Sequence, residues 1–313
     1  MSLHQNSGRW RLGLALSLLT VFLWGILPIA LAVTLQALDV YTVIWFRFLV
    51  SFILLSAYLG MRGELPKLRQ WRSQTWKLLA IATIMLGANY FFFMQGLTLT
   101  SPANAEVLIQ LATLLLGFGG LVIFHERYTL SQWLGVGVLI CGYIIFFRDQ
   151  ITNLITAHST YIFGSGLVVV GAAVWAIYAL AQKQLLQSLS SPNIMMMIYG
   201  GAALLFTPLA KPDTILKLNN LQLGMLIFCA LNTLIAYGAF AESLEHWEAS
   251  RVSAVLTLAP IVTLIAVELV VIFTPGLIPA ENITLTGMIG AVLVVAGSMA
   301  IALGKKSSVD RHK

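Results

Sequence analysis

The stretch SPANAEVLIQLATLLLGFGGLVIFHER, residues Ser101 to Arg127, is a long apolar run that ends at a charged triplet. A helix of this length is sufficient to cross the hydrocarbon core of a bilayer. Its first turns nevertheless carry the polar residues Asn104, Glu106 and Gln110. A carboxylate inside a membrane helix costs about 3 kcal/mol on insertion scales, so it normally faces a partner or a wet cavity.

The composition of the whole chain indicates a polytopic membrane protein. The sequence is 59% hydrophobic and only 10% charged, with a mean hydropathy of +0.89, which excludes an ordinary soluble protein. The net charge of +6 favours orientation in the membrane over nucleic-acid binding, because Lys and Arg are retained on the cytoplasmic side. Cys141 and Cys229 fall in apolar runs, so we expect small core residues and no disulfide framework.

Apolar runs of about 20 residues recur along the chain and predict an all-α protein of ten transmembrane helices. The first run contains Pro28 and is too long for a typical signal peptide, so we expect it to be retained as a helix. The predicted helices are 11–33, 41–60, 77–97, 102–124, 130–147, 161–182, 193–210, 221–242, 249–273 and 284–303.

Basic residues in the connections predict the orientation of these helices. If the N-terminus is inside, the basic connection 61–76 and the basic C-terminal tail also lie inside. The outer connections then hold only Arg148, Lys211 and Lys217. This bias predicts a multi-pass protein of a prokaryotic plasma (inner) membrane with both termini in the cytoplasm.

The opening stretch has a weaker copy, EASRVSAVLTLAPIVTLIAVELVVIF, in residues 248–273. An ungapped alignment of the two regions places Tyr90 opposite Tyr237. Each half holds five predicted helices, an odd number, so the second half enters the membrane from the opposite side. The sequence therefore predicts an inverted-topology repeat with units 11–148 and 161–304, an architecture that favours a central site and alternating access.

The chain resembles the EamA-type branch of the drug/metabolite transporter superfamily over nearly its whole length. The resemblance rests on Trp24 and Trp175, on Arg47, on the stretches TSPANAEVL and EASRVSAVL, and on Pro260. It implies a pseudo-twofold helical bundle whose cavity is lined mainly by the first, third, fourth, sixth, eighth and ninth helices. Members of this family are mostly exporters of amino acids and other small metabolites.

Proline placement distinguishes the two halves. Pro260 lies inside the predicted helix 249–273, where it removes a backbone hydrogen bond and predicts a hinge or a carbonyl free to face a cavity. The family's fourth helix usually carries a proline where this chain has Thr113. Threonine bends a helix only mildly, so the resemblance does not extend to a full break there.

Three ionisable residues lie within predicted helices. Arg47 and Glu106 are equally deep from the outer face, so we expect an ion pair between them. Such a pair either clamps two helices or faces the substrate, and a buried carboxyl group is what proton coupling requires. Glu268 has no evident basic partner and either reaches a wet cavity or lies at the level of the lipid headgroups.

Polar amides and aromatic residues are concentrated in the helices that the resemblance assigns to the cavity. Interhelical hydrogen bonding and packing explain these side chains as well as solute contact does. Their concentration favours solute contact. The candidate cavity residues are Trp24, Asn89, Tyr90, Asn104, Gln110, Trp175, Tyr178, Asn232 and Tyr237.

These patterns predict a secondary transporter of a small organic metabolite, an amino acid or an amphipathic solute, that exports it by alternating access. The alternative is a non-transporting membrane receptor or a channel-like facilitator. All five histidines fall in predicted loops or tails, which argues against an intramembrane enzyme and a metal site. No phosphate-cradling loop is present, so we expect no ATP-driven pumping by this chain. No cofactor is expected. The expected partners are a small-molecule substrate, the lipid bilayer and, if transport is coupled, protons, and no nucleic acid.

Overall fold

The computed structural model is a bundle of helices, and none of the residues that it describes forms a β-strand. It describes residues 9–66, 71–112, 114–115, 118, 129–154, 159–186, 188–247, 252, 255–278 and 284–303. The predicted bend at Thr113 and the charged triplet 125–127 lie outside these residues.

Five helices among the described residues are long and apolar enough to cross a membrane. They lie in α1 (Trp10–Thr34), α2 (Val40–Arg62), α3 (Ser73–Leu99), α7 (Ser159–Leu185) and α9 (Asn220–His246). Shorter apolar helices lie in α6 (Leu130–Leu154), α8 (Ser191–Phe206), α11 (Ala259–Phe273) and α12 (Leu285–Leu303). The other described elements are α4 (Pro102–Ile109) and the short 3₁₀ helix η2 (Pro212–Lys217). The part of the chain that the structure describes is therefore all-helical, with several helices long and apolar enough for a membrane protein.

Most predicted boundaries agree with the structure to within a few residues. The C-terminal ends of two helices illustrate the differences. The helix predicted at 193–210 ends at Phe206, because Pro208 has no backbone N–H to continue the helical hydrogen bonds. The helix predicted at 130–147 continues to Leu154, beyond the apolar run, because a polar segment can extend a helix out of the apolar layer. The fourth and ninth predicted helices are described mainly as α4 and α11.

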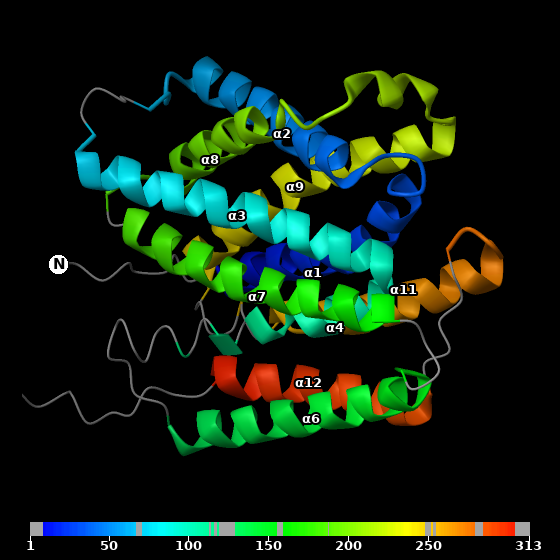
Figure 1. Cartoon of the computed structure of the whole chain (residues 1–313). Coiled ribbons are helices and arrows are strands. Elements are labelled where there is room, and N and C mark those ends of the chain that lie inside the picture. The colour runs from blue at the N-terminus through cyan, green and yellow to red at the C-terminus, as the bar shows by residue number, and fades with distance from the viewer. Residues whose placement is uncertain are drawn as a thin grey trace, which may run out of the picture.

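The helices associate mainly in pairs that join the first half of the chain to the second. The pairs are α1 with α9, α2 with α8, α3 with α7, α4 with α11 and α6 with α12. Figure 1 shows α3 lying along α7 in the middle of the bundle and α6 lying along α12 at its lower edge. The two halves therefore interleave and do not form two separate bodies.

Glycine contacts fix the direction of the α6–α12 pair. The Cα of Gly135 packs against Gly297, and Gly142 packs against Gly290. A low residue number in one helix thus meets a high number in the other, which only antiparallel helices give. A Cβ added at Gly142 would lie 2.6 Å from the backbone nitrogen of Val294. The two backbones are therefore in direct contact, as in other membrane helix pairs built on small residues.

Two other pairs are antiparallel by the same criterion. Gly96 packs on Gly164 in the α3–α7 pair, while the Asn89 side-chain amide, two turns earlier, donates to the Gly171 carbonyl oxygen at 3.0 Å. In the α2–α8 pair, the ring of Phe52 lies against Gly200. The Trp45 indole N–H, two turns earlier on α2, donates to the Thr207 hydroxyl at 3.1 Å.

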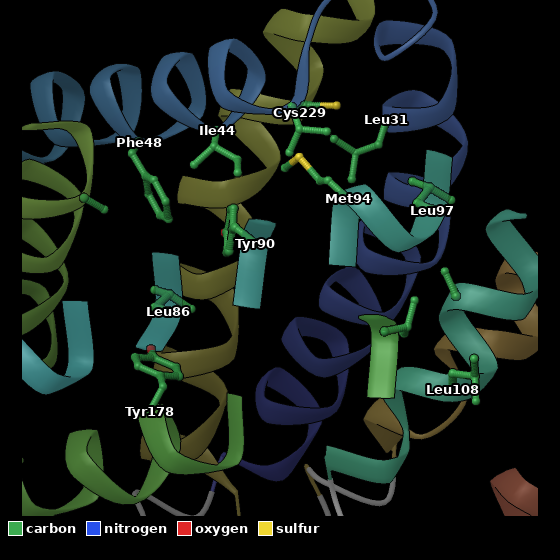
Figure 2. Close-up of a cluster of buried hydrophobic side chains, with 14 of the residues drawn as sticks. Leu31, Ile44, Phe48, Leu86, Tyr90, Met94, Leu97, Leu108, Tyr178 and Cys229 are labelled. Atoms are coloured by element: carbon green, nitrogen blue, oxygen red, sulfur yellow. The ribbon is translucent and has the colours of Figure 1, made fainter. Parts of the chain in front are cut away.

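The interior of the bundle is a continuous apolar core. Phe48 from α2, Leu86, Tyr90 and Met94 from α3, Tyr178 from α7 and Cys229 from α9 belong to it, and Figure 2 shows them gathered in one region. Large apolar side chains such as Ile144 and Leu204 are exposed on the outside. An apolar interior with an equally apolar exterior is what a protein surrounded by lipid requires.

The start of α2 depends on a helix cap that yields a testable prediction. The Asp39 carboxylate accepts from the Thr42 backbone N–H at 3.0 Å and from its hydroxyl at 2.7 Å. The Thr42 hydroxyl in turn accepts from the Lys211 backbone N–H at 2.9 Å, which ties α2 to the end of the α8 loop. We expect Asp39→Ala to lower the free energy of unfolding by about 1 kcal/mol.

Thermal unfolding in detergent micelles, followed by circular dichroism, measures this loss. The matched control is Asp213→Ala, because Asp213 is an exposed acid in the first turn of η2. Equal loss in the two variants would show that the Asp39 cap does not stabilise the bundle.

Candidate functional site

Four tyrosines from four helices converge inside the bundle: Tyr90 (α3), Tyr178 (α7), Tyr199 (α8) and Tyr237 (α9). They lie close enough to interact electrostatically with one another. The first three are buried and Tyr237 is half-buried. The Tyr199 hydroxyl donates to the backbone carbonyl oxygen of Thr233 at 3.3 Å. We call these four residues the tyrosine cluster, and Figure 2 shows two of them, Tyr90 and Tyr178, in the core.

Arg47 from α2 lies against the tyrosine cluster with only 3% of its surface exposed. Its Nε donates to the Cys229 carbonyl oxygen at 3.2 Å and to the Thr233 hydroxyl at 3.1 Å. Its Cζ lies 4.5 Å from the centre of the Tyr90 ring, a cation–π contact worth about 0.5–2 kcal/mol. Arg47 thus joins α2 to α3 and α9.

The predicted contact between Arg47 and Glu106 is not formed among the described residues. Both side chains are deep in the bundle, as the sequence predicts. Arg47 lies on the face of α2 that meets α9, whereas α4 packs against α7, α11, α1 and α3. Equal depth in the membrane is therefore not enough to predict a contact between two side chains, because these two leave their helices in different directions.

Aromatic rings extend from the tyrosine cluster toward α1. Trp24 lies edge-on to Tyr237, with ring centres 5.4 Å apart, and 5.9 Å from Phe240. Trp175 lies 6.3 Å from Tyr178 and beside the Tyr237 hydroxyl. The structure thus brings together the predicted aromatic residues of the first, third, sixth and eighth predicted helices. Trp24 and Trp175 are half-buried, so parts of both rings are accessible.

Two of the predicted amides join neighbouring helices. The Asn89 side chain donates to the carbonyl oxygen of Gly171 at 3.0 Å, from α3 to α7. The Asn232 side chain donates to the carbonyl oxygen of Leu23 at 2.6 Å, from α9 to α1. These contacts match the interhelical interpretation of both residues, and Asn232 keeps a buried Oδ1 that accepts no hydrogen bond from any described residue.

The short helix α4 holds the other predicted polar residues. Its N-cap is Ser101, whose hydroxyl accepts from the Asn104 backbone N–H at 3.2 Å. The Asn104 side chain donates to the Ser165 hydroxyl of α7 at 3.1 Å, while its Oδ1 is buried without a described donor. Gln110, also buried, ends the helix. Buried polar atoms without partners are uncommon, and each one needs an explanation.

Glu106 is 7% exposed and receives no hydrogen bond or ion pair from any described residue. A carboxylate in such a position costs several kcal/mol unless a partner arrives or the group is neutral. Glu106 therefore differs from a structural acid such as Asp39, whose oxygens are occupied at a helix start.

Glu268 lies on the outside of the bundle. It is exposed on α11 among Ile265, Leu269 and Ile272, which are also exposed. Whether Glu268 reaches a wet cavity or the lipid headgroups stays a prediction, and it does not share a region with Glu106.

Two helices are interrupted at corresponding positions. The helix α4 ends at Ile109 and Gln110 forms a turn, while α11 begins at Ala259 directly after a turn at residues 257–258. In the ungapped alignment, Gln110 corresponds to Thr257. The Val107 carbonyl oxygen accepts from the Gln110 backbone N–H at 3.3 Å within this turn and also from the Tyr143 hydroxyl at 3.2 Å.

Pro260 lies in the first turn of α11, and not in mid-helix as its sequence position predicts. The reason is the turn that precedes it. A proline in the first turn removes no helical hydrogen bond, because its N–H would have no partner there. Pro260 thus helps to begin a helix after the interruption, and its contribution to a hinge stays a prediction.

Sequence reasoning missed three contributors to the site: Tyr199, Thr233 and the carbonyl group of Cys229. Tyr199 lies in the seventh predicted helix, which is not among the helices that the resemblance assigns to the cavity. Thr233 and Cys229 are one helical turn apart, so both face α2, but neither residue type marks a membrane site by itself. Cys229 is buried, as predicted for a core residue, whereas Cys141 is exposed, so the prediction is wrong for Cys141.

Comparison with known proteins agrees with this architecture. The family model of the EamA-like transporter family matches residues 11–148 and 162–303. The chain belongs to the EamA-like transporter family, and it is therefore a multi-pass membrane transporter.

Individual relatives cover nearly the full chain. "Uncharacterized inner membrane transporter YhbE" of Escherichia coli (strain K12) is 37% identical over 296 residues, which is 94% of this chain and 92% of that protein. An "Uncharacterized transporter" of Haemophilus influenzae is 35% identical over 295 residues, 94% and 96% of the two chains. A crystal structure with a TM-score of 0.63 and 16% identity covers 92% of this chain and 96% of its own, which supports the fold alone. The relatives and the apolar helices together indicate a bacterial inner-membrane location.

Proposed function

We propose that this transporter exports a small organic metabolite, an amino acid or an amphipathic solute, by alternating access. The proposed architecture is ten membrane helices arranged as two inverted units, residues 11–148 and 161–304, with both termini in the cytoplasm. The observation that carries the proposal is the pair of interrupted helices, α4 and α11, at corresponding positions of the two halves.

Interrupted helices are a common way to build a solute site inside a membrane protein. Broken helices expose backbone carbonyl and N–H groups that bind a polar solute, and such groups are tolerated only where they are buried in protein or line a wet cavity. The α4 interruption lies beside the buried polar side chains of Asn104, Glu106 and Gln110. The α11 interruption lies beside Thr263, whose hydroxyl donates to the Gly25 carbonyl oxygen of α1 at 2.7 Å.

The helix pairs support the inverted arrangement. If two halves have opposite topologies, each helix runs antiparallel to its counterpart. The pairs α2–α8 and α6–α12, which are counterparts, are antiparallel. In the two proposed units, α1 corresponds to α7 and α3 corresponds to α9. A twofold axis relating the units would therefore exchange the pair α1–α9 with the pair α3–α7, and both pairs are among the main contacts of the bundle. A parallel repeat would give parallel counterparts.

The chemistry of the interior favours an amphipathic solute. The tyrosine cluster supplies hydroxyl groups, and the half-buried rings of Trp24, Trp175 and Tyr237 supply apolar faces. Rings of this kind bind an apolar or cationic part of a solute, while hydroxyl and amide groups orient its polar part.

Counterflow in liposomes tests the proposal. Purified protein is reconstituted in vesicles, and the uptake of labelled amino acids and other small metabolites is measured with and without unlabelled solute inside. A carrier is expected to give saturable uptake that internal solute accelerates. Uptake without acceleration would indicate a channel-like facilitator, and no uptake of any solute by folded protein would favour a receptor.

Two variants of α1 connect this activity to the site. We expect Trp24→Ala to lower counterflow about tenfold, because it removes a ring that contacts Tyr237. Phe22→Ala on the same helix is the matched control, because Phe22 is 55% exposed on the outside. An equal effect of the two changes would place the solute path elsewhere.

A further inference from the structure

We propose that Arg47 binds the carboxylate group of the transported solute, with Tyr90 holding the guanidinium in place. The substrate class is then small carboxylic acids, amino acids included, and not amines or neutral solutes. This inference rests on the proposed transport function and specifies the substrate of that same site.

The position of Arg47 requires a physical explanation. It is the eighth residue of α2, so it lies about 11 Å along the helix from Val40, well inside the apolar layer. A positive charge is expensive there, and such residues pair with an anion, with carbonyl groups or with water in a cavity. Its burial excludes an arginine that simply extends to the membrane surface.

The described contacts of Arg47 leave part of the guanidinium unused. Nε donates to the Cys229 carbonyl oxygen and the Thr233 hydroxyl, and the face of the group lies over the Tyr90 ring. A guanidinium has five N–H donors in one plane, and no described residue accepts from either Nη. The two Nη groups form the edge that binds a carboxylate through two parallel hydrogen bonds.

No described acid neutralises Arg47. Asp39 caps α2, and Glu64 pairs with Arg62 at the far end of the same helix. Glu242 pairs with His246. The remaining acids whose side chains the structure describes, Glu106, Asp213 and Glu268, form no ion pair with a described residue. Among the described side chains, Arg47 therefore contacts only the dipoles of the Cys229 carbonyl and Thr233 hydroxyl groups and the Tyr90 ring.

The surroundings favour a carboxylate over a phosphate. Arg47 is the one buried cation among the side chains that the structure describes, and its neighbours are Tyr90, Phe48 and Tyr199. A phosphate ester carries more charge and would need further cations or metal ions. A carboxylate carries a single negative charge, which one guanidinium balances, and the nearby rings suit an attached apolar side chain.

The alternative is that Arg47 only fastens α2 to α9. Ser51, one turn further along α2, makes a contact of that kind, because its hydroxyl donates to the Ala230 carbonyl oxygen at 3.4 Å. Ser51→Ala therefore removes a structural link between the same helices without touching the guanidinium, and it serves as the matched control.

The test compares acids with their amides in the counterflow assay. Leucine and leucinamide, and phenylalanine and phenylalaninamide, compete for uptake of the solute that wild type transports best. We expect wild type to prefer the acid by at least about tenfold, because a site built to bind a polar group rejects analogues that lack it. Arg47→Gln is expected to abolish this preference, while Ser51→Ala retains it.

The outcomes separate this inference from the proposed function. If wild type shows no counterflow of any solute, the transport function itself fails. If wild type transports solutes but binds acid and amide equally well, transport stands and the carboxylate site is wrong. The comparison of acid and amide uses wild-type protein alone, so it can contradict the carboxylate site even if Arg47→Gln does not fold. An Arg47→Gln protein that keeps the preference for the acid would also overturn the inference.

Discussion

Replacing Glu106 by glutamine is expected to abolish transport driven by a pH gradient without destabilising the protein. Glu106 is buried and has no described partner, so its charge is costly, and we propose that it is the group that exchanges the proton if transport is coupled. Glutamine has almost the same shape and no charge, so its burial costs less. Loss of function with equal or higher thermal stability is typical of residues kept for activity.

The measurement is uptake into liposomes with an imposed pH gradient, beside thermal unfolding of the same preparation. Glu268→Gln is the matched control, because Glu268 is exposed on the outer face of α11. We expect that variant to keep the pH response. If Glu106→Gln transports normally and unfolds at a lower temperature, Glu106 is a structural residue and not a coupling residue.

The second large effect concerns the contact between α6 and α12. Gly142→Ala is expected to lower the free energy of unfolding by about 1–3 kcal/mol, because the added methyl group would lie 2.6 Å from the Val294 backbone nitrogen. The backbone of α12 cannot rotate away as a side chain can, so the two helices must separate.

Gly137→Ala on the same helix provides the control. A Cβ at Gly137 meets nothing within 4 Å, and alanine favours a helix over glycine by about 1 kcal/mol. This variant is expected to be neutral or slightly more stable in thermal unfolding. Similar behaviour of the two variants would mean that the glycine contact does not hold α6 against α12.

Much of the fold could be predicted from the sequence, because hydropathy determines where a helix enters and leaves the membrane. The helix predicted at 11–33 is observed at Trp10–Thr34, and the one predicted at 284–303 at Leu285–Leu303. Hydropathy does not show where a helix is interrupted. Pro260 therefore lies at the start of α11, whereas its sequence position predicted the middle of a longer helix.

The site was only partly predictable, for a related reason. Residue types identified Trp24, Trp175, Tyr178 and Tyr237 as interior aromatics, and the structure brings these rings together. Sequence gives the depth of a residue along a helix, but helix packing decides which neighbour it faces. Arg47 consequently meets α9 and Tyr90, contacts that depth alone could not predict.

The interleaved pairing of helices also constrains how the protein is made. The helices α1, α2, α3 and α6 enter the membrane first, yet each has its main partner in the second half of the chain. During synthesis these helices must remain in the bilayer with their small-residue faces uncovered until α7, α8, α9 and α12 arrive. A chain that ends after α6 would lack the main partner of each of them, so the stable bundle is completed only near the end of translation.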